Sequence, residues 1–391
     1  MSKTAKAHGM DGTLIEADWP PLKLAELSAL FSMFHGLGEA MEILSVSPRP
    51  FSAASVVATS AGRVFIKRHH RTVRDAEGLH EEHRFMEHLR AHGAPAPRVF
   101  AALSGETAIE MGEWTYEVHE APEGVDLYVD ALSWTPFQAS AHARSAGQAL
   151  ARLHLASEGF EAPRRKPQPL VAGFTIFAAQ NPLEELQNYM SARPALAESA
   201  AAREYGKQAL ELLAPFHAEL MPILPVLKPL WTHNDLHASN LLWSGGGPNA
   251  QVTAIIDFGL SDRTNAVCDL AQAIERSIVE WITLMNDPAH PENVGVHLDQ
   301  FDALLDGYGS VRPLSDEEAA ALAPMIALCH AEFALTEADY YLGVLHSEGS
   351  ARVALDDYLV GHARWFRSPS GERLLDALRR WAEMRERVEE G

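Results

Sequence analysis

The sequence predicts an α+β protein in two lobes, a small β-rich lobe followed by a larger, mostly helical one. Three observations predict it: a length of 391 residues, ordinary shares of apolar (47%) and charged (22%) residues, and a change in hydrophobic periodicity after Gly124. Chains of this length usually form more than one compact unit. The composition excludes disorder, collagen and coiled coil as the whole fold.

The charge balance of the sequence limits which partners the protein is expected to bind. There are 32 Lys+Arg against 53 Asp+Glu, a net charge of −21, which argues against nucleic acid or an anionic membrane as the main partner. Cys268 and Cys329 are too few for a disulfide framework or a cysteine-based zinc site. Residues 1–20 lack the apolar core of a signal peptide, and no run approaches eighteen apolar residues. We therefore expect a cytoplasmic protein, with its oligomeric state open.

The N-terminal lobe is expected over residues 25–120, after a leader of residues 1–24. Its order of hairpin, helix and further strands predicts an antiparallel sheet with one main helix packed on it. Two shorter features are also predicted: an amphipathic helix over 22–35, and a turn at 60–62 that joins the hairpin strands. The other predicted elements are strands 51–58 and 63–68, a helix 76–91, and strands 98–103, 107–111 and 115–119.

The C-terminal lobe is expected over residues 121–391 and should be mostly helical. Ser315 and Glu318 fit a capping box at the start of one helix, and Pro324 should kink that helix or mark its true start. The predicted helices are 141–156, 200–220, 264–285, 316–346 and 372–388.

One segment of this lobe carries polar residues suited to chemistry. Residues 240–243 and 252–256 read as two short strands joined by a glycine-rich turn. Such a hairpin would bring Asp235, Asn240 and Asp257 together at one end. Three oxygen ligands on two loops suit Mg²⁺, a hard cation that otherwise keeps water and phosphate oxygens.

These residues resemble the kinase signature set. In phosphoryl transfer the protein mainly positions the reactants and neutralises charge, with one carboxylate facing the attacking hydroxyl and others holding metal on the nucleotide. The three motifs occur in the expected chain order. They are Val64-Phe-Ile-Lys67, His233-Asn-Asp235-Leu-x-x-x-Asn240 and Asp257-Phe-Gly259.

The resemblance is not to ordinary protein kinases. No glycine-rich loop precedes Lys67, the expected hairpin tip at residues 51–55 has no glycine, and the distance from Asp257 to Asp269 leaves no room for a long activation loop. Over roughly residues 40–345 the chain resembles the aminoglycoside phosphotransferase-like family, which includes choline kinases and type II homoserine kinases. Segments that carry this likeness, beside the motifs above, are Ala149–His154, Cys268–Ala271, and the more homoserine-kinase-like Asp302–Tyr308 and Arg312–Glu317.

The resemblance implies a bilobal protein-kinase-like fold and a role for each matched residue. It implies ATP and Mg²⁺ as cofactors, with Asp235 as the catalytic base or hydroxyl orienter. An unperturbed aspartate has a pKa near 4, and we expect this value for Asp235. The resemblance also implies Asn240 and Asp257 as magnesium ligands, and Lys67 on the nucleotide phosphates, with Glu82 as the ion-pair partner of Lys67 and Glu77 and Glu81 as rivals for that role. Glu117 and His119 would belong to a hinge segment, 117–120, that meets the adenine. His233 and Asp269 would give structural support.

The predicted function is transfer of the γ-phosphoryl group of ATP to a hydroxyl of a small, amine-bearing metabolite. A protein Ser/Thr kinase of the same fold group and a catalytically silent nucleotide-binding protein remain alternatives, and GTP is not excluded. His233 and His237 stand four apart, but a zinc site is disfavoured because no Glu follows His233 in an H-E-x-x-H pattern. Residues that could bind the amine are the acidic Asp262, Glu275, Glu280, Glu332, Glu337 and Asp339, and the aromatic Trp281, Tyr340 and Tyr341.

Overall fold

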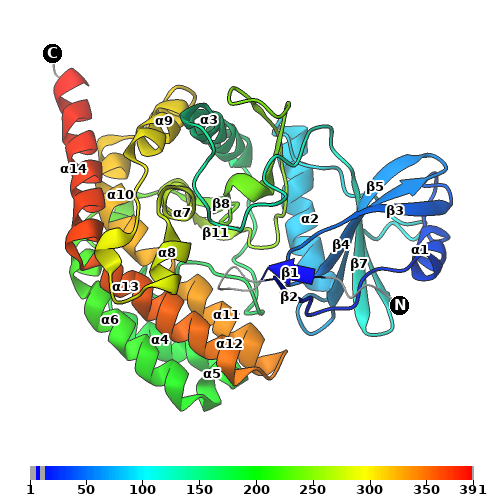
Figure 1. Cartoon of the computed structure of the whole chain (residues 1–391), viewed down its shortest axis with the longest axis horizontal. Coiled ribbons are helices and arrows are strands. Elements are labelled where there is room, and N and C mark those ends of the chain that lie inside the picture. Colours follow the sequence, from blue (N-terminus) through cyan, green and yellow to red (C-terminus); the bar gives the residue numbers. More distant parts are fainter. Residues whose placement is uncertain (1–5, 9–13, 390–391) are drawn as a thin grey trace.

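The structure, a computed structural model, describes residues 6–8 and 14–389, so residues 1–5 and 9–13 of the predicted leader lie outside the described residues. A β-rich part and a larger helical part lie side by side (Figure 1). The predicted α+β class and bilobal architecture are confirmed. The described leader residues include a two-stranded antiparallel ribbon, β1 (Lys6–His8) and β2 (Leu14–Glu16).

The β-rich part contains one antiparallel five-stranded sheet, in the order β3-β4-β5-β7-β6. A separate apolar cluster holds α1 on the sheet: Leu27 and Leu30 of α1 pack over Val57 and Ile66, all fully buried. The elements are α1 (Leu24–Phe31), β3 (Ala40–Val46), β4 (Ala53–Thr59), β5 (Gly62–His70), α2 (Ala76–Ala91), β6 (Ala108–Met111) and β7 (Trp114–Glu120).

One prediction for this part is wrong, and one strand was missed. Residues 98–103 form no strand among the described elements, because they contribute only isolated bridges such as Val99 to His119. Conversely, β3 was not predicted, since its residues are mostly exposed at the sheet edge and show no alternating burial. The expected hairpin tip at 51–55 is also displaced: the loop between β3 and β4 is 47–52, residues 53–55 belong to β4, and this loop also lacks glycine.

Helix α2 lies between the sheet and the helical part (Figure 1). The side chain of Asp75 caps it by accepting a 2.8 Å hydrogen bond from the Gly78 amide. Its buried Phe85 and Leu89 belong to the core of the helical part. The helix is thus fixed against both parts of the molecule.

The helical part is built around α3 and α9, which cross closely. A Cβ on Gly147 would lie 2.1 Å from the Leu304 carbonyl oxygen, and one on Gly307 would lie 2.1 Å from that of Arg144. Glycine is therefore required at both positions. The helices are α3 (Ser140–Ser157), α4 (Pro182–Ser191), α5 (Pro194–Glu198), α6 (Ala200–Leu220), α7 (Ala266–Ile278), α8 (Trp281–Asn286), α9 (Leu298–Gly309), α10 (Asp316–Leu328), α11 (Ala331–Gly343), α12 (Glu348–Val353), α13 (Gly361–Phe366) and α14 (Pro369–Glu389), with a π-helical turn at Ala354–Val360.

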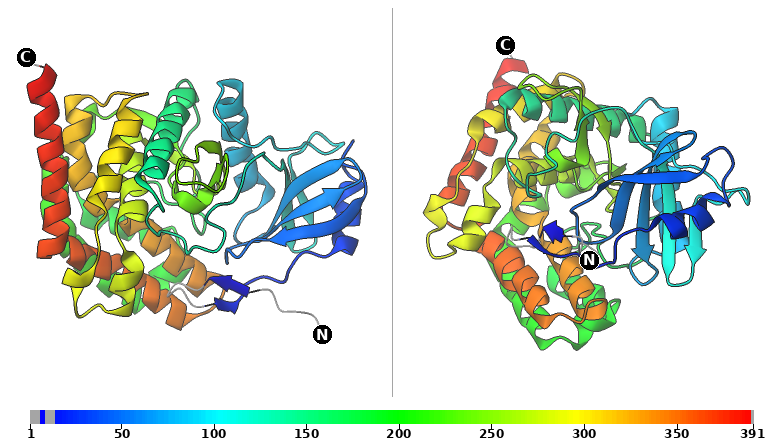
Figure 2. Two further views of the ribbon diagram at one scale, coloured as in Figure 1. Left: turned by 45° about the horizontal axis from the view of Figure 1, so that its top comes forward. Right: turned by 45° about the vertical axis from the view of Figure 1, so that its right-hand side comes forward.

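The expected long helix over 316–346 is two helices, α10 and α11. Pro324 lies inside α10, and the break falls further along, between Leu328 and Ala331. The Ser315–Glu318 capping box is present. An 18-residue window within Asp316–Gly343 is apolar enough to cross a membrane, but 94% of it is buried inside the structure, as in the core of a globular fold. The views in Figure 2 show α14 along the outer edge of this part.

Four short strands carry the polar segment. Strand β9 (Leu241–Trp243) pairs antiparallel with β10 (Val252–Ile255), as expected, and β8 (Pro229–Thr232) pairs antiparallel with β11 (Asp262–Asn265). The two ribbons bring the loop after β8 next to the loop after β10. This places the candidate residues of both loops together.

Candidate active site

One cavity opens between the sheet and the helical part. Lys67 lines it from β5, and Asp235, Asn240 and Asp257 line it from the two loops of the helical part. These are the residues that the motifs singled out. The rest of the lining includes the β3–β4 loop, the segments 73–74 and 132–134, and the helices α8 and α11.

Lys67 and Asp257 form an ion pair across the cavity. The Lys67 Nζ lies 2.7 Å from the Asp257 Oδ1. Burial alone would raise the pKa of Asp257, but the Lys67 ammonium outweighs burial and lowers this pKa to about 2. Burial alone would lower the pKa of Lys67, and the negative charges of Asp257, Glu117 and Glu82 raise it instead. Both groups are charged at neutral pH.

The expected pairing of Lys67 with a glutamate of α2 is not met in this structure. Glu82 is buried and its Oε2 lies 3.6 Å from the Arg165 Nη2. Its two rivals also have other partners, since Glu81 contacts Arg165 and Glu77 contacts Lys166. Glu82 contributes negative charge near Lys67 without a direct contact. The reason is that the Arg165 side chain reaches α2 from the 161–169 loop.

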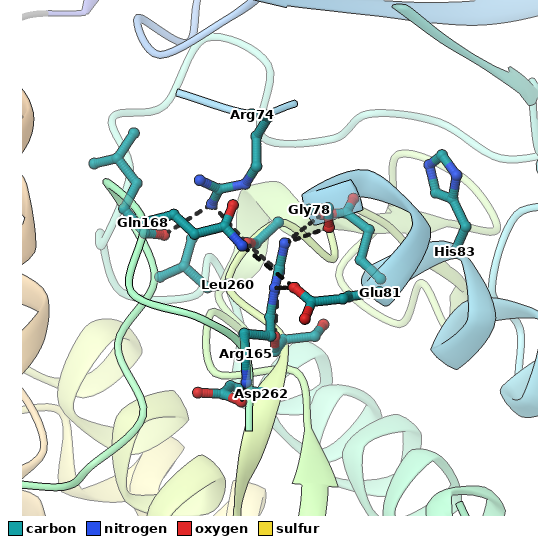
Figure 3. Close-up of polar contacts among 12 residues, drawn as sticks. Arg74, Gly78, Glu81, His83, Arg165, Gln168, Leu260 and Asp262 are labelled. Atoms are coloured by element: carbon teal, nitrogen blue, oxygen red, sulfur yellow. Dashed lines mark hydrogen bonds and ion pairs between the residues drawn. The ribbon is translucent and has the colours of Figure 1, made fainter. Parts of the chain in front are cut away.

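Two buried arginines tie α2 to the segment that follows Asp257 (Figure 3). Arg165 donates to the Gly78 carbonyl oxygen of α2 at 2.7 Å and to the Gly259 carbonyl oxygen at 3.0 Å. Arg74 donates to the same Gly259 oxygen at 2.9 Å. The position of Gly259, and with it the backbone beside Asp257, therefore depends on the placement of α2.

Asp235 is held at both carboxylate oxygens. The Arg276 Nη1 donates to Oδ1, and the Asn240 Nδ2 donates to Oδ2 at 3.0 Å. Burial raises the pKa of Asp235 to about 6, with a further contribution from the charge of Asp257, although Arg276 and His233 oppose the rise. The expectation of an ordinary pKa near 4 is therefore wrong, because it ignored burial.

The loop that carries Asp235 is fixed from below. Asp269, on the first turn of α7, accepts hydrogen bonds from the backbone amides of His233 (2.9 Å) and Asn234 (2.8 Å), and the His154 ring contacts it at 3.0 Å. The His233 Nε2 contacts the Ile256 carbonyl oxygen at 3.0 Å, and its Nδ1 accepts from the Asp235 amide. Together these contacts connect the two loops of the site.

Two residues of these loops adopt a backbone conformation that side chains disfavour. Asn234 and Asp257 both have φ = 61°, in the left-handed region. The Asn234 side chain offsets this strain, since its Oδ1 accepts from Thr232 at 2.7 Å and its Nδ2 donates to the Leu260 carbonyl oxygen at 3.2 Å. Strain of this kind persists only where neighbouring contacts fix the backbone.

The segment Glu117–Glu120 is not a hinge loop, which corrects the expectation. These residues end strand β7, and the Val118 carbonyl oxygen and the Glu120 amide already bond to residues 98–100. The side chains of Glu117 and His119 are also occupied. Glu117 is almost fully buried, and its carboxylate contacts three imidazoles, from His69 (3.0 Å), His83 (2.8 Å) and His119 (2.7 Å).

This cluster has an electrostatic role. Burial alone would raise the pKa of Glu117, but the histidines, His119 foremost, keep it well below its usual range. Glu117 is directly opposite Lys67 in the β5–β7 register, so their side chains share a face of the sheet. A strand was predicted over residues 115–119, and the alternation of its side chains would have indicated this position; the error was the hinge role given to residues 117–120.

One protein-family model matches the part of the sequence that carries these residues. The model described as "APH: Phosphotransferase enzyme family" matches residues 50–314, which include every motif residue of the cavity. The chain belongs to the phosphotransferase enzyme family. Its curated relatives include a homoserine kinase from Agrobacterium fabrum, 26% identical over 240 residues. The match covers 61% of this chain and only 61% of the length of that relative.

Two solved kinase structures share the fold. The microcompartment-associated aminopropanol kinase has a TM-score of 0.57 at 17% identity, covering 89% of this chain and 99% of that one. The amicoumacin kinase hAmiN, in complex with AMP-PNP, Ca²⁺ and Ami, has a TM-score of 0.55 at 13% identity, covering 87% of this chain and 92% of that one.

Three arginines of this phosphotransferase site were missed from sequence. Arg276 on α7 holds Asp235, Arg165 holds Gly259, and Arg49 lines the cavity from the β3–β4 loop. The local pattern did not single out Arg276, because the buried faces of α7 also carry Asp269, Gln272 and Glu275. Charged residues are rarely fully buried unless they are paired, and the pairing of Arg276 with Asp235 depends on the tertiary fold.

Proposed function

We propose that the chain is an ATP-dependent kinase that transfers the γ-phosphoryl group to a hydroxyl group of a small, amine-bearing metabolite. One observation carries the proposal: Asp235, Asn240 and Asp257 line the same cavity as Lys67, which reaches it from the other part of the molecule. Residues 25–120 then form the nucleotide-binding lobe, and residues 121–391 supply the catalytic loop, metal site and acceptor pocket. We place the protein in the cytoplasm.

The nucleotide phosphates would lie against the cationic side of the cavity. Lys67 supplies one ammonium group there, and Arg49 supplies a guanidinium group. The negative charges of Asp257 and Asp235 act on this guanidinium group. Arg49 lies in the loop that lacks the glycines of protein kinases. A side-chain cation in this loop therefore takes over part of the charge neutralisation that backbone amides give elsewhere.

The donor set fits a magnesium ion. Asn240 uses its Nδ2 on Asp235, which leaves its Oδ1 as a ligand, and Asp257 has a second carboxylate oxygen beyond the one on Lys67. Both are hard oxygen donors, as Mg²⁺ requires. Mg²⁺, when bound, neutralises charge on the β- and γ-phosphates. The low pKa of Asp257 keeps this ligand ionised through the neutral range.

Asp235 would act on the acceptor. Its carboxylate, oriented by Arg276 and Asn240, receives a hydrogen bond from the acceptor hydroxyl and accepts its proton as the oxygen bonds to the γ-phosphorus. The bond between the γ-phosphorus and the β,γ-bridging oxygen breaks, and the nucleoside diphosphate leaves with that electron pair. The pKa of about 6 leaves Asp235 mostly ionised at pH 7 yet a stronger base than an ordinary aspartate.

The relatives support an amine-bearing acceptor. Homoserine and aminopropanol, the substrates in the names of two relatives, each combine a hydroxyl with an amine. The nucleotide analogue AMP-PNP and the Ca²⁺ in the amicoumacin kinase complex support the use of a nucleotide and a divalent cation. A protein kinase is disfavoured because β11 begins at Asp262, five residues after Asp257, which leaves no long peptide-binding activation segment between them.

The test is an ATP-consumption screen against hydroxylated amines and amino acids, with product identification by mass spectrometry. We expect one or more to be phosphorylated in the presence of Mg²⁺. Asp235→Asn should lower kcat by about 10²–10⁴-fold, the range for a positioned general base, while circular dichroism shows an unchanged fold. Radiolabel found only on protein, or ATP binding without transfer to any acceptor, would overturn the proposal in favour of its alternatives.

A further inference from the structure

Part of the cavity lining is aromatic, and we call this part, formed by residues 134, 281, 333, 341 and 358, the acceptor end. Trp134, Phe333, Tyr341 and Tyr358 line it, and Trp281 and Met285 continue the wall. The rings come from four separate segments, and their faces attract cations. The Arg276 guanidinium already lies over two of them, 5.2 Å from the Trp134 centroid and 4.8 Å from the Phe333 centroid, which leaves Tyr341 and Tyr358 to face a ligand. A single carboxylate lies among them, that of Glu337 on α11.

Glu337 differs from the other acidic residues that the sequence offered as amine ligands. Its side chain is buried, with 4% exposed, and its Oε2 has no hydrogen-bond donor within the part of the chain that the structure describes. The other five have partners. Asp262 accepts from the Arg165 and Arg263 amides, Glu275 contacts His362, Glu280 contacts His297, Glu332 accepts from the Gly173 and Ile176 amides, and Asp339 contacts Arg193.

A buried carboxylate oxygen without a donor is costly, because it has lost its hydration and gained no hydrogen bond. Such a group in a native structure calls for an explanation. A bound molecule that donates an N–H to Glu337 would remove the cost, and the surrounding rings would stabilise its positive charge. Asp235, which would receive the acceptor hydroxyl, lines the same cavity as Glu337, and the charge of Asp235 acts on the Glu337 carboxyl.

We propose that Glu337 binds the protonated primary or secondary amine of the acceptor, so that the enzyme selects hydroxylated ammonium compounds over their neutral and quaternary counterparts. This rests on the proposed function. A quaternary ammonium satisfies the rings but has no N–H for the Glu337 Oε2, and a neutral analogue satisfies neither. The site therefore requires both the charge and the N–H.

The charge state of Glu337 provides a second readout. Burial and the charge of Asp235 raise its pKa to about 8, and Arg276 only partly opposes this. At pH 7 about 90% of the Glu337 carboxyls then carry a proton before the amine binds. Binding of an ammonium group favours the ionised form, so it should release that proton. The other titratable groups that line this end are His237, Tyr341, Tyr358 and His362.

The experiment compares matched acceptors with wild type, Glu337→Gln and Glu280→Gln. Glu280, partnered by His297 and 39% exposed, is the control carboxylate. The probes are homoserine against 4-hydroxybutanoate, which lacks the amine, and 3-aminopropan-1-ol against its N,N,N-trimethyl derivative. For the amine substrates we expect Glu337→Gln to raise KM by about 10–100-fold, the range for a hydrogen bond to a charged group. KM for the nucleotide and both constants of Glu280→Gln should change less than about 2-fold.

Calorimetry in buffers of different ionisation enthalpy measures proton release without turnover. Wild type should release up to about 0.9 proton per amine bound at pH 7, and Glu337→Gln should release almost none. The inference is overturned if wild type phosphorylates these amines while Glu337→Gln keeps the same KM, if the trimethyl derivative binds as tightly as the primary amine, or if wild type releases no proton. If no amine is phosphorylated at all, it is the proposed function that fails.

Discussion

The acid side of the pH–rate profile tests the role of Asp235 most directly. With a pKa of about 6, Asp235 would be ionised in about 91% of molecules at pH 7 and in about 9% at pH 5. A carboxyl with an ordinary pKa near 3.9 would still be about 93% ionised at pH 5. If the carboxylate must be ionised to accept the acceptor proton, the rate should fall about 10-fold between pH 7 and pH 5.

The assay measures initial rates at sub-saturating nucleotide and acceptor, because these report the free enzyme, with ADP quantified by chromatography at constant ionic strength. Arg276→Gln is the diagnostic variant. Removing the guanidinium beside Asp235 takes away a charge that lowers its pKa, so the acid limb should move to higher pH by about 1–3 units. Titration of the nucleotide phosphates is common to both proteins, so the difference between their profiles isolates Asp235.

Arg276→Lys keeps a positive charge and should shift the acid limb less, and circular dichroism checks that each variant is folded. A wild-type rate that stays constant down to pH 4.5 would refute the reasoning. So would identical acid limbs in wild type and Arg276→Gln, because Asp235 would then not be the group that titrates.

Two further predictions concern the neighbouring carboxylates. Asp257→Asn should lower metal-dependent turnover by at least about 100-fold and abolish Mn²⁺ binding in an electron paramagnetic resonance titration; full activity in Mg²⁺ would contradict the metal assignment. Glu117→Gln should lower the free energy of unfolding in urea at pH 7 by about 1–3 kcal/mol, since three imidazoles lose a charged acceptor, whereas the exposed Glu113→Gln should not. Folding lowers the pKa of Glu117, so the contribution of its carboxylate to the free energy of unfolding is present above the unfolded pKa near 4.5 and is lost as pH falls toward the folded value. A difference in this free energy between wild type and Glu117→Gln that stays constant down to about pH 3 would contradict the prediction.

Local sequence predicted the grouping of Asp235, Asn240 and Asp257 well because its geometry is local. Asp235 and Asn240 are five residues apart, and a short hairpin brings Asp257 beside them, so spacing and turn signals sufficed. The helix predicted over 76–91 has the bounds of α2 to the residue, and its structure shows the cap, Asp75, that fixes its start. Where the relevant contacts lie within about twenty residues, pattern and propensity agree with the tertiary fold.

The ion pairs could not be predicted in this way. Whether Lys67 meets Glu82 or Asp257 depends on how α2 is placed against the sheet, and that placement is set by Arg165, from a loop more than eighty residues away. Nor does spacing reveal burial, which moved the pKa of Asp235 from the assumed value to about 6. Glu117 was given a hinge role although it lies within the strand predicted over residues 115–119, because its three imidazole partners cannot be found from spacing.

The proposed complex would bring a polyanionic nucleotide into an acidic protein. The net charge is −21, yet the cations Lys67 and Arg49 line the cavity, together with Glu337 and aromatic rings. At short range, these nearby charges outweigh the screened field of distant surface carboxylates. The proposed arrangement therefore sorts the substrates by charge, with phosphates toward Lys67 and an ammonium toward Glu337. Asp235, whose carboxylate is held by the Arg276 guanidinium, would then receive the acceptor hydroxyl.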